Sequence, residues 1–154
     1  MWQRIQTVFL VIAIISLIAS IFFPIWIHND PLGQKHVLTP LGYSVEEKGV
    51  ANIQYMPYAI TAMLAAAAAT LAIIEIRKYR NRVLQMKLGA LNSFFIAGMI
   101  AAAVIFSNNL MKTFQGGSYS LGLWLPGVAV LCNFLANRFI RRDERIVRDS
   151  DRLR

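Results

Sequence analysis

Residues 8–27 read VFLVIAIISLIASIFFPIWI, a run of 20 residues without a charged side chain. A helix rises about 1.5 Å per residue, so about 20 apolar residues cross a hydrocarbon core of about 30 Å. Three more apolar blocks of similar length follow at about residues 57–76, 88–110 and 119–140. The sequence therefore predicts an all-α membrane protein, in which residues 1–154 form a single bundle of four transmembrane helices.

The amino-acid composition supports this prediction. Of the 154 residues, 56% are hydrophobic and only 16% are charged, whereas an average soluble domain carries about 25% charged residues. This balance excludes a soluble globular domain, a disordered chain and a disulfide-stapled secreted module. The one cysteine, Cys132, lies inside the fourth apolar block. Disulfide frameworks and cysteine-rich metal sites are therefore excluded.

The distribution of Lys and Arg predicts the orientation of the chain. Of the 16 basic residues, 13 lie before the first block, between the second and the third, or at and beyond the end of the fourth. The other side holds only Lys35, Lys48 and Lys112. By the positive-inside rule we expect both termini in the cytoplasm. The net charge of +8 is therefore first of all a topology signal.

Residues 28–56 form a long connection on the expected outer side. It contains two β-prone runs, HVLTPLGYSV at 36–45 and VANIQY at 50–55, separated by the polar residues 46–49. This pattern predicts a small outer β-hairpin between the first and second helices. A lone hairpin is only marginally stable, so we expect it to lean on the helix ends or on a partner. Trp26, at the end of the first block, is expected at the level of the lipid headgroups.

Small residues are concentrated in the second and third blocks. Residues 65–69 are all alanine, and the third block offers Ala97, Gly98, Ala101 and Ala102. Small residues four positions apart let membrane helices approach closely. The residues predicted to pack helices in this way are Ala66, Ala69, Gly98 and Ala102. The simplest account is packing within the bundle, but the alanine surface also leaves room for an external helix.

Glu75 is the one carboxylate inside a predicted span. An intramembrane carboxylate is a functional candidate by default. Glu75 lies one residue from the end of its span, where it could reach the interface or pair with Arg77, Lys78 or Arg80. We favour the structural interfacial pair over a functional carboxylate.

Three amides lie at a comparable depth: Asn92 in the third block, and Asn133 and Asn137 in the fourth. The spacing of four places Asn133 and Asn137 on one helix face. Together with Glu75 they form a predicted polar cluster near the cytoplasmic boundary. The cluster is either a small-ligand or lipid-headgroup site or a set of interhelical hydrogen bonds, and we favour the hydrogen bonds.

No recognised catalytic or metal-binding motif occurs in the chain. His28 and His36 accompany Asp30, but their spacing matches no known zinc site, so we expect solvated loop histidines. The sequence has no P-loop, no dinucleotide-binding glycine turn, no nucleophile elbow and no HExxH helix. We therefore expect no enzymatic activity, no cofactor and no bound metal.

The C-terminal segment from residue 137 reads NRFIRRDERIVRDSDRLR and continues the fourth block as a charged helix, with residues 141–154 as a cytoplasmic tail. Its charges alternate in sign at helical spacing, as between Arg141 and Glu144. The tail is either a solvated helix or a contact for a partner or anionic lipid. The residues predicted to make that contact are Arg4, Arg141, Arg142, Arg145, Arg148 and Arg152.

The two ends of the chain carry fairly specific motifs. MWQRIQTV at residues 1–8 and IRRDERIVR at 140–148, followed by DRLR at 151–154, resemble an uncharacterised family of short membrane proteins from Bacteroidota. The resemblance covers the whole length. It implies four spans, a long first outer loop and a bacterial inner-membrane location, and it brings no established activity.

These observations lead to two hypotheses about function. The first is a non-catalytic accessory or assembly subunit of a larger bacterial inner-membrane complex, docked through its small-residue helix faces and its basic tail. The alternative is a small-molecule or lipid-binding membrane protein that acts as a homo-oligomer. The expected partners are membrane lipids and other integral membrane proteins. We expect no direct nucleic-acid binding, because acidic residues interrupt the basic tail.

Overall fold

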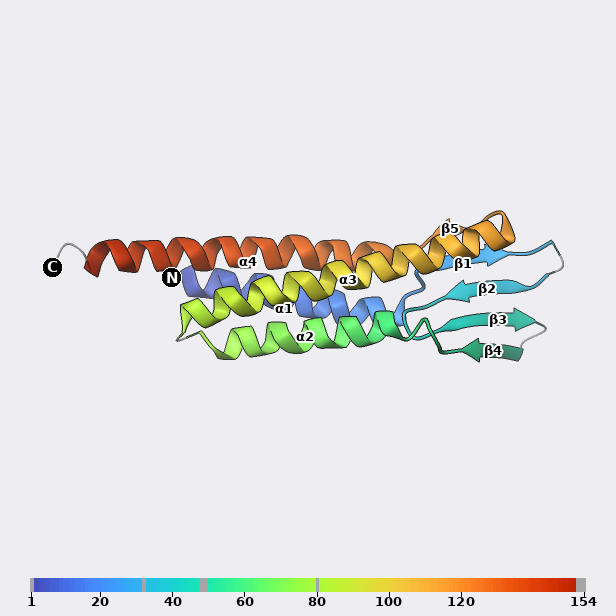
Figure 1. Ribbon diagram of the computed structural model, residues 1–154, viewed down its shortest axis with the longest axis horizontal. Coiled ribbons are helices and arrows are strands. Elements are labelled where there is room, and N and C mark those ends of the chain that lie inside the picture. Colours follow the sequence, from blue (N-terminus) through green and yellow to red (C-terminus); the bar gives the residue numbers. More distant parts are fainter. Residues whose placement is uncertain (1, 32, 48–49, 80, 152–154) are drawn as a thin grey trace.

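The computed structural model describes residues 2–31, 33–47, 50–79 and 81–151, with side chains described between residues 5 and 147. The described residues form four helices: α1 (Trp2–Phe22), α2 (Ile60–Arg77), α3 (Arg82–Phe114) and α4 (Leu121–Asp151). All four are long and apolar enough to cross a membrane. They run along a common axis, and a small sheet lies at one end (Figure 1). Below, this end is the sheet end, and the opposite end, which holds both termini, is the terminal end.

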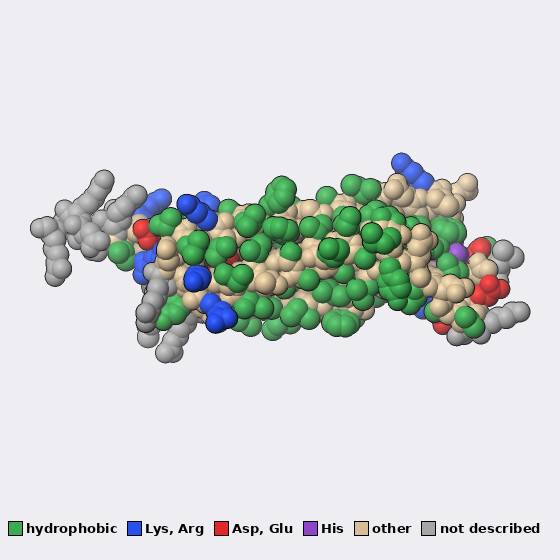
Figure 2. All heavy atoms as spheres, turned by 60° about the horizontal axis from the view of Figure 1, so that its bottom comes forward, with side chains coloured by type: hydrophobic (Ala, Val, Ile, Leu, Met, Phe, Trp, Pro, Cys, Tyr) green, Lys and Arg blue, Asp and Glu red, His purple; other side chains and the backbone are tan. Residues whose placement is uncertain are grey.

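The helices form one bundle in which each packs on two others. α1 contacts α2 and α4, and α3 contacts the same two helices. Hydrophobic side chains cover the length of the bundle, whereas most of the visible Lys and Arg lie towards the terminal end (Figure 2). α4 extends beyond the other helices (Figure 1), as the predicted helical tail requires.

The first helix is shorter at the sheet end than the predicted span of 8–27. α1 ends at Phe22, and Trp26 opens the first strand of the sheet. The cause is Pro24, because a proline disfavours helical geometry at the residue before it and cannot supply a helical N–H. The apolar composition of this stretch therefore hides a change from helix to strand.

Outside the four helices, the described residues form a five-stranded antiparallel sheet, larger than the predicted hairpin. Its strands are β1 (Trp26–Asn29), β2 (Lys35–Leu38), β3 (Tyr43–Glu47), β4 (Val50–Gln54) and β5 (Ser118–Tyr119), in the order β4-β3-β2-β1-β5. The run at 36–45 is divided between β2 and β3 by a tight turn, in which Thr39 and Gly42 exchange backbone hydrogen bonds. The predicted pairing of this run with VANIQY is the β3–β4 hairpin.

Trp26, for which a position at the headgroup level was predicted, is buried inside the protein. Its side chain is 0% exposed and packs with Ile25, Leu38 and Leu110 in a core between the sheet and the helix ends. Gly117 makes this possible, because a Cβ at that position would lie 2.3 Å from the indole Nε1. A second core, rich in alanine, lies between the helices and includes Ala65, Ala68, Ala69, Ala13 and Ala129.

Candidate functional site

An amide network joins α3 to α4 in the terminal half of the bundle. The Asn92 side chain donates from Nδ2 to Asn133 Oδ1 at 3.3 Å. Asn133 Nδ2 in turn donates to the Gly89 carbonyl oxygen at 3.0 Å and to Ser93 Oγ at 2.8 Å. Asn92 and Asn133 are both fully buried. These hydrogen bonds connect the two helices and fix their alignment, which apolar packing alone would leave poorly defined.

Asn137 lies one helical turn beyond Asn133 and packs against Gly89. A Cβ on Gly89 would lie only 2.2 Å from Asn137 Oδ1 and 2.5 Å from its Nδ2, so the amide occupies space that glycine leaves open. The Asn137 side chain is 8% exposed. Its Oδ1 accepts no hydrogen bond from the described residues. Among the described residues, Asn137 Oδ1 is therefore a buried acceptor without a donor, at the edge of the network.

A groove of about 780 Å³ opens beside Asn137, between α3 and α4. Its described lining consists of Ala90 and Ser93 from α3 and of Phe134, Asn137, Arg138, Arg141, Arg142 and Arg145 from α4. Three of the predicted contact arginines thus share one surface. Arg138 was missed, although its spacing of three, four and seven to Arg141, Arg142 and Arg145 indicates one helix face. The side chains of Arg4 and Arg148, and Arg152 altogether, lie outside the described residues.

Glu75 differs from the expected interfacial ion pair. Its side chain is 0% exposed, and neither carboxylate oxygen has a hydrogen-bond partner among the described residues. Arg77 and Lys78 are exposed, and Arg80 lies outside the described residues. The reason is helical geometry, because Glu75 follows the buried Ala68 and Ala72 along the inner face of α2.

Gln85, which was not among the predicted site residues, connects Glu75 to α3. Its Nε2 donates to the Glu75 backbone oxygen at 2.9 Å, and its side chain is 4% exposed. The spacing of seven between Gln85 and Asn92 was the available signal, because it places both on one face of α3. Of the predicted polar cluster, the structure joins Asn92 to Asn133 by a hydrogen bond, places Asn137 beside them, and shows no bond from Glu75 to the three amides among the described residues.

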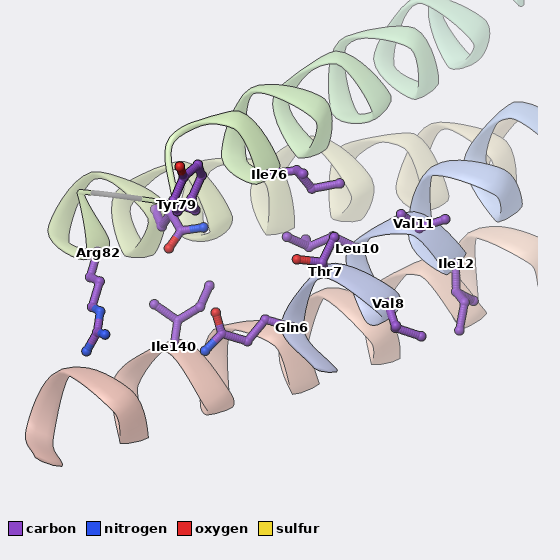
Figure 3. A pocket seen from close by; sticks show the side chains of 11 residues that line it. Gln6, Thr7, Val8, Leu10, Val11, Ile12, Ile76, Tyr79, Arg82 and Ile140 are labelled. Atoms are coloured by element: carbon purple, nitrogen blue, oxygen red, sulfur yellow. The ribbon is translucent and has the colours of Figure 1, made fainter. Parts of the chain in front are cut away.

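A second cavity, of about 510 Å³, lies at the terminal end on the α1 side (Figure 3). Its walls are mainly apolar and include Leu10, Val11, Ile76 and Ile140. Polar groups stand at its rim, where Gln6 Nε2 donates to Asp143 Oδ2 and Arg82 Nη1 donates to the Asp143 backbone oxygen, both at 2.9 Å. Asp143 therefore bonds to α1 and α3. It does not line the groove between α3 and α4 that holds the arginines.

The histidines differ from the expected solvated loop residues. The His36 side chain is 4% exposed, its Nδ1 lies 2.7 Å from Tyr43 Oη, and its ring centroid lies 4.3 Å from that of Phe114. His28 pairs with His36 across β1 and β2, and its ring stacks on Trp26. Burial and the nearby Tyr58 raise the pKa of Tyr43, which keeps its hydroxyl neutral. The described residues contain no group of three or more potential metal ligands of the His, Cys, Asp and Glu types.

The four predicted packing residues divide between inside and outside. Ala69 belongs to the buried core, Gly98 faces Leu64 of α2, and Ala102 is half-buried. Ala66 is exposed. Three of the four therefore face the bundle at least in part, and Ala66 presents a small side chain to the outside.

Comparison with known proteins identifies a family. Residues 2–153 match the model of a protein family described as a domain of unknown function, DUF4293. This range includes nearly all of both end motifs, so the predicted resemblance to an uncharacterised family is confirmed at that level. No curated protein matches the chain.

Proposed function

We propose that this chain, which belongs to the DUF4293 family, is a non-catalytic accessory or assembly subunit of a larger bacterial inner-membrane complex. The observation that carries the proposal is the edge strand β4. It stands at the end of the sheet order, and all five of its residues are exposed. The unpaired side of such a strand can hydrogen-bond to an extended segment of another chain.

Apolar side chains on β4 strengthen this argument. Val50 is 65% exposed and Ile53 is 51% exposed. Lipid accounts for exposed apolar residues on the helices, but it does not account for them on a strand beyond the apolar spans. A protein partner does, because it would bury them while pairing with the strand.

The exposed apolar surface continues from β4 onto α2. Tyr55, Met56, Ile60 and Met63 are exposed, and Ala66 follows one turn further on. A membrane helix of the partner would fit against this line, because the small Ala66 allows close backbone approach. The subunit would thus dock laterally through α2 and, outside the membrane, through β4.

The proposed orientation follows the positive-inside rule. The terminal end, with its arginines, would face the cytoplasm, and the sheet would face the periplasm of a bacterium of the Bacteroidota. The tail arginines would supply a further contact, either with a cytoplasmic segment of the partner or with anionic lipid.

The alternative is a small-molecule or lipid binder that acts as a homo-oligomer. The groove of about 780 Å³ and the cavity of about 510 Å³ support it, because both fall within the usual size of ligand sites, about 300–1,000 Å³. A β4–β4 pairing between two copies would produce such an oligomer.

The test is affinity purification of the tagged protein from native membranes in mild detergent, with the recovered proteins measured by mass spectrometry. We expect a stoichiometric set of membrane proteins, which Ile53→Lys on β4 releases. Leu121→Lys is the matched control, because Leu121 is 59% exposed but begins α4 next to β5, at the opposite edge of the sheet from β4. Recovery of the chain alone, or only of further copies of it, would contradict the subunit proposal and favour the homo-oligomer.

A further inference from the structure

Basic and acidic residues alternate in the sequence of the α4 tail. In the structure, four arginines lie on one face of the helix and the acidic Asp143 lies on another. Arg138, Arg141, Arg142 and Arg145 recur at intervals of three and four and line the groove between α3 and α4. Asp143 is held on another side by its bonds with Gln6 and Arg82. The described lining of the groove contains four arginines and no acidic residue. Its surface is therefore strongly cationic, although the tail is not.

Asn137 contributes a buried amide to the wall of the groove. It lines the groove, its side chain is 8% exposed, and its Oδ1 packs against Gly89 of α3. Because Oδ1 is itself buried, it does not face a ligand in the groove. The arginines therefore carry the charged contacts of the groove.

The groove also has an apolar side. Ala90 and Phe134 line it beside the arginines. Further along the same two helices, towards the sheet end, Phe94 is 75% exposed and Leu131 is 64% exposed. A ligand that fits both parts therefore has an anionic head and an apolar tail.

We propose that this groove binds an anionic phospholipid, such as phosphatidylglycerol, through its phosphate. The arginine guanidinium groups would pair with the phosphate through charge-assisted, often bidentate hydrogen bonds. The acyl chains would lie against Phe134 and Leu131.

The experiment is native mass spectrometry of the full-length protein titrated with defined lipids in detergent. We expect phosphatidylglycerol to bind about tenfold more tightly than phosphatidylcholine, because several arginines face its net charge. Phosphatidic acid keeps the phosphate and carries at least the same negative charge, so it should bind at least as tightly as phosphatidylglycerol. Equal binding of phosphatidylglycerol and phosphatidylcholine would overturn the proposal.

Variants separate the two parts of the site. Arg141→Gln with Arg145→Gln should weaken both anionic lipids about tenfold. Phe134→Ala, on the apolar side, should weaken phosphatidylglycerol and phosphatidylcholine alike and keep the preference between them. The matched control is Arg77→Gln with Lys78→Gln, which removes two exposed cations at the same end of the bundle but outside the groove. An equal loss in the control would show nonspecific charge attraction and overturn the proposal.

The phosphate could also come from a soluble molecule. Glycerol 3-phosphate carries the same phosphate and hydroxyl chemistry without acyl chains. We expect it to displace phosphatidylglycerol only at concentrations about 100-fold higher, because it lacks the contact with the apolar side. Displacement at equal concentration would identify a soluble phosphate site and overturn the lipid assignment.

Discussion

The two ends of the bundle both bury polar side chains, but they do so in different surroundings. At the sheet end, Trp26 and His36 are enclosed by strands and by the ring of Phe114. At the terminal end, Asn137 lines an open groove, and Gln6 and Gln85 line the neighbouring cavity. The sheet end is thus packed as a structural cap, whereas the terminal end has space for ligands. Changes at the sheet end should affect stability most, and changes at the terminal end should affect binding most.

The largest effect is expected for Trp26→Ala at the sheet end. Removing a fully buried aromatic side chain costs about 3–5 kcal/mol of unfolding free energy. Trp124→Ala is the matched control, because Trp124 is 66% exposed. It should change the unfolding free energy by less than about 0.5 kcal/mol. Denaturant unfolding in detergent micelles measures both, and similar losses for the two variants would contradict the enclosed cap.

Gly89→Ala tests the tightest contact at the terminal end. The new methyl group would overlap the Asn137 amide, so we expect a loss of about 1–3 kcal/mol in unfolding free energy. Gly127→Ala is the control, because a Cβ there meets nothing within 4 Å. Combining Gly89→Ala with Asn137→Ala should recover most of the loss, since the smaller side chain vacates the space. A loss that persists in the double variant would show that Asn137 is not the obstacle.

Glu75→Met tests whether the buried Glu75 carboxylate destabilises the terminal end of the bundle. Met is apolar and close to Glu in size, and both carboxylate oxygens are buried without partners among the described residues. The substitution should therefore raise the unfolding free energy by about 1 kcal/mol. Gln85→Met is the contrasting variant, because it removes the bond to the Glu75 backbone oxygen and should lower stability by about 1 kcal/mol. A loss of stability in Glu75→Met would show that the carboxylate has a partner.

Most of the helical architecture could be predicted from the sequence, because about 20 apolar residues crossing a bilayer form a strong and local signal. The sheet was predicted only in part. Pro24 ends α1 inside an otherwise apolar run, and β5 pairs with β1 although the two strands are about 90 residues apart in the sequence. Pairing over such a distance depends on where the helices place their ends, which composition does not encode.

The candidate site shows the same limit. The depth of Asn92 and Asn133 was readable from their positions in the spans, and the structure joins them. The direction of each side chain around its helix was harder to read. Glu75 turns into the bundle, and the Asp143 carboxylate bonds to Gln6 instead of lining the groove with the arginines of α4.

An effect as small as that of Glu75→Met is expected for Tyr43→Phe at the sheet end, and it depends on pH. The variant loses the hydrogen bond with His36 Nδ1, so the unfolding free energy should fall by about 1 kcal/mol at pH 7. Burial raises the pKa of Tyr43 above its ordinary value of about 10. The unfolded chain therefore loses this proton first, and the wild-type protein loses stability as the pH rises above about 10.

The Phe variant lacks this ionisation, so the difference between the two proteins should narrow above that pH. Thermal unfolding between pH 7 and pH 11 measures the difference, with Tyr55→Phe as the control, because Tyr55 is 58% exposed. A constant difference across this range would show that Tyr43 ionises equally in the folded and unfolded chains. The sheet end would then be more open to solvent than its packing indicates, and the contrast between the two ends would weaken.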